Sequence, residues 1–256
     1  MASFGAVVLL GVALPALAGD DATTQQKIEA RLAKAKLQSE GQIDVSVKNG
    51  SAVLTGGVTT VAAQREAQRL ARKEAKFVEN RVEVIPAPRP DADIVKDIRR
   101  EILSYPRLTA FDSIDFGVDQ GHVVLSGSVL WGYRRDDVEN AVTRIAGVRS
   151  VKDDIGIQDA SPFDAQLRGQ IYARIYGGVG AVLPGAGERT DAPVRIVVDH
   201  GKVILTGYVN SEVDRTLVGL AARDTLAFDV DNRVKLDGEP PAVDSKPKTT
   251  GPGVEI

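Results

Sequence analysis

The chain has no cysteine and few aromatic residues, and both shortages narrow the functions it can have. Because none of its 256 residues is cysteine, disulfide bonds, thiol catalysis and cysteine-bound zinc are excluded. Phenylalanine, tryptophan and tyrosine together make up 5% of the chain. The net charge of −3 lacks the basic excess of a general nucleic-acid binder, so we expect no nucleic acid among its partners.

Residues suited to catalysis are also scarce. The two histidines, His122 and His200, stand beside the turn glycines of hairpins, and we interpret them as solvated turn residues. The adjacent acidic pairs at 136–137 and 153–154 lack the ligand spacing of a calcium loop. The glycine-rich stretch 176–188 follows a predicted helix, whereas a dinucleotide fingerprint follows a strand. We therefore expect no enzymatic activity, no cofactor and no metal.

What the chain does contain is one hairpin pattern three times. Residues 47–58 read "VKNGSAVLTGGV", residues 118–129 read "VDQGHVVLSGSV" and residues 198–209 read "VDHGKVILTGYV". In each copy a glycine stands where a two-residue turn needs positive φ, and apolar residues alternate before it. A second glycine follows six residues later, which predicts a bulge or a close backbone approach.

Helical patterns flank each hairpin, and a short apolar strand closes each copy. Asp91 is suited to cap the helix before the second hairpin, and Ser161 with Asp164 resembles a capping box before the third. The repeating unit is therefore α-β-β-α-β and about 70 residues long. The fold class that follows is α+β, with three tandem small modules, each a three-stranded mixed sheet packed against two helices.

The expected boundaries follow from these patterns and from the linkers between them. They are a signal peptide over 1–18, module 1 over 22–88, module 2 over 91–158, module 3 over 161–237 with a glycine-rich insertion at 174–190, and a disordered tail over 238–256.

The first eighteen residues, "MASFGAVVLLGVALPALA", carry no charge and end in a small-x-small cleavage pattern. This is typical of a secretory signal peptide, although no basic residue precedes the apolar run. The alternative is an uncleaved anchor, but the segment is shorter than the roughly 20 residues that span a bilayer. We expect export to the periplasm and no transmembrane span in the mature chain.

The spaced "GxVxLxG" hairpin, the "AGVRSV" turn at 146–151 and the closing strands resemble the BON domain, a small module of bacterial envelope proteins. The resemblance covers roughly 22–237. It brings no catalytic residues, and it implies an envelope or osmotic-stress protein with phospholipid surfaces as the proposed ligand. The insertion in module 3 departs from the family pattern.

Two surfaces are candidates for such binding. Module 1 has a net charge of +4 and module 2 of −3, while residues 161–236 of module 3 have a net charge of zero. On a helix, five basic residues of module 1 fall within one arc of roughly 100°: Arg65, Arg69, Arg72, Lys73 and Lys76. They are suited to anionic headgroups, or alternatively form a solvated outer face.

The second candidate is "LWGYRR" at 130–135, which combines Trp131 and Tyr133 with Arg134 and Arg135 in the manner of a membrane interface. Alternatively, Trp131 covers one end of a small core. The sequence thus favours a non-enzymatic envelope protein whose modules bind surfaces, with an anionic phospholipid surface as the partner. The alternative is a protein–protein adaptor or a chaperone-like periplasmic protein that uses exposed sheet edges and binds envelope proteins.

Overall fold

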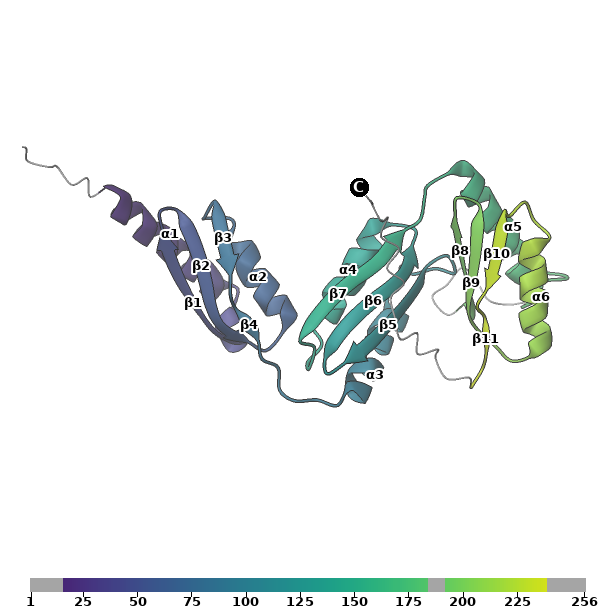
Figure 1. Ribbon diagram of the computed structural model, residues 1–256, viewed down its shortest axis with the longest axis horizontal. Coiled ribbons are helices and arrows are strands. Elements are labelled where there is room, and N and C mark those ends of the chain that lie inside the picture. Colours follow the sequence, from purple (N-terminus) through teal and green to yellow (C-terminus); the bar gives the residue numbers. More distant parts are fainter. Residues whose placement is uncertain (1–15, 184–191, 239–256) are drawn as a thin grey trace, which may run out of the picture. The chain divides into compact units, whose positions relative to one another are not determined.

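The computed structural model describes residues 16–183 and 192–238, in which three similar modules follow one another along the chain (Figure 1). The contacts within the chain divide it into two compact units. The first holds module 1 and most of module 2; the second holds module 3 together with Pro106–Ser113 and Ser128–Leu130 from module 2.

Module 1 has the expected order of helices and strands. Its elements are α1 (Ala16–Lys34), the 3₁₀ turn η1 (Leu37–Ser39), β1 (Gly41–Lys48), β2 (Ser51–Val58), α2 (Val61–Ala71), β3 (Phe77–Asn80) and β4 (Glu83–Val84). Strand β2 lies in the middle of the sheet: it pairs antiparallel with β1, and parallel with β3 and β4.

Modules 2 and 3 repeat this arrangement. Module 2 consists of α3 (Asp91–Ser104), β5 (Ser113–Asp119), β6 (His122–Val129), α4 (Gly132–Val142) and β7 (Ser150–Ile157), with β6 central. Module 3 consists of α5 (Pro162–Tyr176), β8 (Val194–Asp199), β9 (Lys202–Val209), α6 (Glu212–Arg223), β10 (Asp229–Asn232) and β11 (Lys235–Leu236), with β9 central. The predicted α+β fold of three α-β-β-α-β modules is confirmed.

In modules 1 and 3 the closing strand is interrupted and forms two short strands, so each of these sheets has four strands instead of the expected three. An asparagine explains the interruption in both. The side chain of Asn80 accepts the N–H of Val82, and that of Asn232 accepts the N–H of Val234, both close to 3.1–3.2 Å. Because each asparagine bonds its own backbone two residues on, the ladder breaks locally and then resumes.

An aspartate in the first helix of every module holds the hairpin turn. Both carboxylate oxygens accept a backbone N–H from the turn, at 2.7–3.0 Å in all three modules. The pairs are Asp21 with Asn49 and Gly50, Asp91 with Gln120 and Gly121, and Asp164 with His200 and Gly201. The expected roles of two of these aspartates change accordingly. Pro90, and not Asp91, is the N-cap residue of α3. The Ser161 hydroxyl accepts the backbone N–H of Asp164, and the carboxylate of Asp164 bonds the hairpin turn.

The second glycine of each hairpin has a positive φ, 111° at Gly56, 108° at Gly127 and 112° at Gly207. A Cβ on Gly207 would lie 2.0 Å from the carbonyl oxygen of Pro193, and one on Gly56 would lie 2.2 Å from that of Gln42. The prediction of a close backbone approach is therefore confirmed at these two positions, and only glycine fits there.

Each core lies between the helices and the sheet. In module 1, Ile28 and Leu32 of α1 and Ala67 of α2 pack against Leu54 and Val58 of β2. In module 3, Ile171 and Ile175 of α5 and Val218 of α6 cover β8 and β9 in the same way. This is the packing that the alternating strands and helical stripes predict.

The outer edge of β8 is closed by groups from outside the sheet. The N–H of Ile196 donates to the carbonyl of Ala110 at 2.7 Å. The N–H groups of Val194 and Val198, on the same edge, donate to the Tyr176 hydroxyl and the Gln158 side chain. The three N–H groups of β8 that point away from β9 are thus all hydrogen-bonded, so β8 offers no free edge to a partner strand.

Several expected segments lie wholly or partly outside the described residues. The predicted signal peptide is described only from residue 16, where α1 begins, and the predicted tail only at residue 238. In the insertion at 174–190, α5 continues to Tyr176, and Val182 and Leu183 pack against the module 3 core; 184–190 is not described.

Candidate binding surfaces

The predicted basic stripe of module 1 begins on α2. Thr60 caps this helix by accepting the N–H of Ala63 at 3.2 Å, and the helix ends at Ala71. Arg65 and Arg69 therefore lie on the helix, Arg72 is its C-cap, and Lys73 and Lys76 belong to the turn that follows. The helix is shorter than the stripe because the chain must leave it to form β3 alongside β2.

The two helical arginines are engaged in ion pairs. Arg69 bonds Glu66 through two nitrogens at 2.5 and 2.6 Å, and this contact holds the pKa of Glu66 below its usual value. The guanidinium of Arg65 lies 2.8 Å from the carboxylate of Glu139. The positive charge of both arginines is therefore partly compensated by a neighbouring carboxylate, which weakens their attraction for another anion.

The remaining three cations differ from these. Arg72, Lys73 and Lys76 are exposed, and none has an ion pair with any residue that the structure describes. The ammonium of Lys76 lies 5.7 Å from the ring centre of Phe77, which is 65% exposed at the start of β3. We call Arg72, Lys73, Lys76 and Phe77 the basic corner. Its aromatic member was missed from the sequence, although its strand register places it opposite the buried face.

The second candidate surface is less available than its sequence indicates. Trp131 is 53% exposed as the N-cap residue of α4, so it does not serve as a cover for the core. Arg134 is only 8% exposed and stands over the ring of Tyr133. Arg135 lies 3.2 Å from Asp136 and 3.5 Å from Asp153. The aromatic side chains are accessible, while the two cations are buried or paired.

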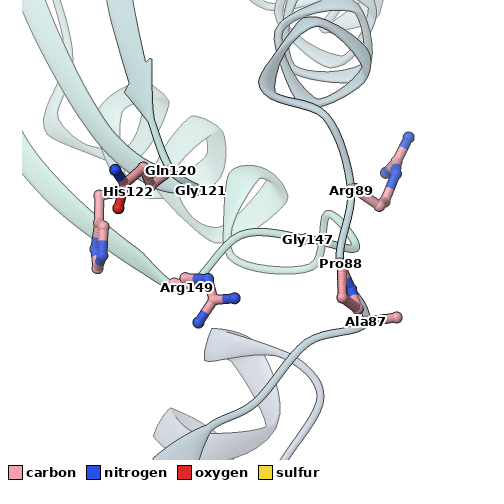
Figure 2. Close-up of a pocket in the computed structure, with 8 residues that line it drawn as sticks. All are labelled: Ala87, Pro88, Arg89, Gln120, Gly121, His122, Gly147 and Arg149. Atoms are coloured by element: carbon pink, nitrogen blue, oxygen red, sulfur yellow. The ribbon is translucent and has the colours of Figure 1, made fainter.

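A hollow of about 350 Å³ lies beside the turn of the second hairpin (Figure 2). The linker residues Pro88 and Arg89 form one wall, and Gly121, His122 and Arg149 lie opposite. Arg89 is bonded to Asp97 and to the carbonyl of Ala146, and His122 to Ser150. Figure 2 shows the side chains of Arg89 and His122 pointing away from each other, so they do not converge on a common point in the hollow.

Among the described residues, no group of histidine and acidic side chains is arranged to hold a metal ion, and no buried side-chain nitrogen or oxygen lacks a hydrogen-bond partner. No helix in the described ranges is both long and apolar enough to cross a membrane. Together, these observations describe an array of small repeated modules that carry exposed cations and aromatic side chains.

Comparison with known families identifies these modules. The BON domain matches residues 20–86, 90–159 and 173–238, which together cover most of the chain. The chain therefore belongs to the BON domain family, as its hairpins and closing strands predicted. The third match begins within α5, later than the start at 161 expected for module 3.

Solved structures give only distant likenesses. CdsD, a structural protein of the type III secretion system of Chlamydia trachomatis, has 18% identity over 82% of this chain and 90% of its own, with a TM-score of 0.25. The periplasmic domain of PrgH, a type III secretion inner-membrane protein from S. typhimurium, has 13% identity over 82% of this chain and 100% of its own, with a TM-score of 0.20. No curated protein matches the chain. At these scores the likenesses carry no argument about function.

Proposed function

We propose that the protein is a non-enzymatic, surface-binding protein of the cell envelope, exported to the periplasm, and that module 1 contacts anionic phospholipid headgroups through the basic corner. Membership of the BON family supports the location, since BON domains are known in envelope and osmotic-stress proteins. The family is not a known enzyme family, which agrees with the lack of converging reactive groups in the described residues.

The observation that carries the lipid proposal is the division of the basic residues into paired and unpaired sets. Arg72, Lys73 and Lys76 form no ion pair within the described ranges, so their charge is available to a headgroup. Each cation near an anionic bilayer contributes about 1 kcal/mol, so three give weak, reversible attraction. Phe77 adds an apolar side chain at the same place, which suits the boundary between headgroups and acyl chains.

The repetition of modules strengthens such a weak contact. Trp131 and Tyr133 of module 2 are exposed aromatics of the type found at membrane interfaces. When modules on one chain touch the same surface, the second contact becomes intramolecular and the overall affinity rises without any strong single site. A role in osmotic or envelope stress protection is supported by family membership, since BON domains are known in such proteins.

The experiment is co-sedimentation of the full chain with vesicles of phosphatidylglycerol and phosphatidylcholine. A triple variant with Arg72→Gln, Lys73→Gln and Lys76→Gln removes the unpaired cations. A matched variant with Arg65→Gln, Arg69→Gln and Arg81→Gln removes three paired cations and changes the net charge equally. We expect the first variant to bind at least tenfold more weakly than the second, because three contributions of about 1 kcal/mol are lost. Equal binding by both variants would refute the basic corner as the site.

A second candidate function, protein binding by strand addition, is favoured by one observation. The edge strand β1 of module 1 has the same register as β8, but no group outside the sheet, among the described residues, accepts the N–H of Ile43, Val45 or Val47. Val47→Pro removes an outward N–H at a position whose side chain is less buried than that of the core residue Val45, and proline occurs at such edges. If β1 binds envelope proteins, capture from envelope extract survives high salt and is lost in this variant; unchanged capture would exclude the edge.

A further inference from the structure

The second helix of each module presents the same face to solvent, and this face has a different chemistry in each module. The helices align at their N-caps, Thr60, Trp131 and Ser211, and bury equivalent positions. The outward positions lie two, five, six and nine residues after the cap. In module 1 they are Ala62, Arg65, Glu66 and Arg69, and in module 2 they are Tyr133, Asp136, Asp137 and Asn140. In module 3 they are Val213, Thr216, Leu217 and Leu220. Only the third of these faces is aliphatic.

This apolar stripe of α6 is exposed. Val213 is 65% exposed, Leu217 42% and Leu220 52%, while Val218, Gly219 and Ala222 on the opposite side are buried against the sheet. Scattered single apolar residues on a surface are ordinary, but three at i, i+4 and i+7 form a continuous strip along one helix face. Such a strip is suited to packing against another helix.

Charges at the two ends of the stripe indicate what kind of helix fits. Glu212 and Arg223 are eleven positions apart, about three helical turns, so they lie above one another along one flank of the stripe. Glu212 pairs only within its own helix, with Arg215, and Arg223 has no ion-pair partner in the part of the chain that the structure describes. This flank of the stripe is thus acidic at its N-terminal end and basic at its C-terminal end, where the neighbouring Asp224 is paired with Arg174.

We propose that α6 is a homodimerisation surface, on which two copies of the chain pack their α6 helices antiparallel about a two-fold axis near Leu217. In this arrangement Val213 of each copy meets Leu220 of the other, and Glu212 meets Arg223 at both ends. A parallel pair would place like charges together, whereas the antiparallel pair also aligns the helix dipoles favourably. The charge pattern therefore selects a second copy of this helix as the occupant.

The dimer is expected to be weak. Three aliphatic side chains cover much less than the roughly 800 Å² per partner of a standard stable interface, so the dissociation constant is micromolar or higher. The proposal stands independently of lipid binding, because it concerns another module and is tested without vesicles. If both hold, the dimer presents two basic corners to one membrane and raises avidity.

Analytical ultracentrifugation of the full chain, from low micromolar to the highest soluble concentration, tests the dimer. We expect the average mass to rise from monomer toward dimer. Leu217→Asp with Leu220→Asn installs the residues that α4 has at these positions, and it raises the dissociation constant at least tenfold while the helical circular dichroism is unchanged. The matched control on α2, Glu66→Gln with Arg69→Gln, leaves it unchanged. A monomer at every concentration, or a dimer insensitive to the α6 change, overturns the proposal.

The absence of native cysteine allows a test of the orientation. After mild oxidation, Thr216→Cys, close to the two-fold axis, links to itself, whereas Glu212→Cys links to a chain with Arg223→Cys and not to itself. Arg65→Cys, at the position on α2 equivalent to Thr216, is the control and stays unlinked. Self-linking of Glu212→Cys in preference to Thr216→Cys overturns the antiparallel arrangement. Loss of vesicle binding in the α6 variants of a monomeric chain also overturns the proposal, and assigns the face to lipid.

Discussion

The buried carboxylate of Asp164 accepts the backbone N–H of Gly201 at 2.8 Å and so ties the first helix of module 3 to its hairpin turn. Its other oxygen accepts the N–H of His200 at 3.0 Å. The same clamp recurs with Asp21 and Asp91, although neither of these is as fully buried as Asp164. The clamp explains how a small module with a modest core fixes the position of its first helix.

Removing the clamp should destabilise module 3 more than module 1. Asp164→Ala leaves two turn N–H groups without an acceptor. Burial lowers the pKa of the Arg168 guanidinium, and the substitution also removes the carboxylate that does most to offset this lowering. We expect a loss of about 3 kcal/mol or more, against about 1 kcal/mol for the partly exposed Asp21→Ala. Amide hydrogen exchange measured module by module gives both values, and Asp164→Asn should fall between them. Equal losses at 164 and 21 would show that burial does not set the strength of the clamp.

The second hairpin glycine gives a backbone prediction. Gly207→Ala must accommodate a Cβ at φ 112° against the Pro193 carbonyl, so we expect module 3 to lose about 2–3 kcal/mol. Gly117→Ala is the control, because a Cβ there meets nothing within 4 Å and its φ is not positive. Thermal unfolding of both variants tests this, and a Gly207→Ala transition that matches the Gly117→Ala transition would contradict it.

Tyr176 predicts how module 3 responds to alkali. Its hydroxyl donates to the carbonyl and accepts the N–H of Val194, both at 2.8 Å, and burial raises its pKa to about 12. Because this pKa lies above the unfolded value of about 10, the neutral hydroxyl stabilises the fold fully below pH 10, and this contribution is lost between pH 10 and 12. Absorbance titration at alkaline pH should show one late tyrosine that is absent in Tyr176→Phe. A titration in which every tyrosine ionises near pH 10 would contradict the burial.

The repeated hairpins and their order were predictable because local patterns specify them. Turn glycines require positive φ, and alternating apolar residues define one buried face, whatever the rest of the chain does. The interruption of the closing strand also has a local signal in the sequence, the "NRV" shared by residues 80–82 and 232–234. The aspartate clamp has a signal too, since each module places an aspartate in its first helix.

Features that depend on tertiary contacts were less predictable. The burial of Arg134 and the pairing of Arg65 with Glu139 result from neighbours distant in sequence, which a helical projection does not reveal. The closure of β8 by Ala110 joins residues that are far apart along the chain. The basic stripe likewise contains two arginines in ion pairs and three cations without one, and this division depends on side-chain contacts that the sequence does not reveal.

The central claim is that the protein binds membranes through charge. Co-sedimentation of the unmodified chain with anionic and neutral vesicles, over a series of salt concentrations, tests it most directly. The account predicts binding to anionic vesicles that falls steeply as salt is added and little binding to neutral vesicles, because exposed charges are screened beyond about 10 Å at 0.1 M salt. Equal binding to both lipids, or binding that salt does not affect, would contradict it.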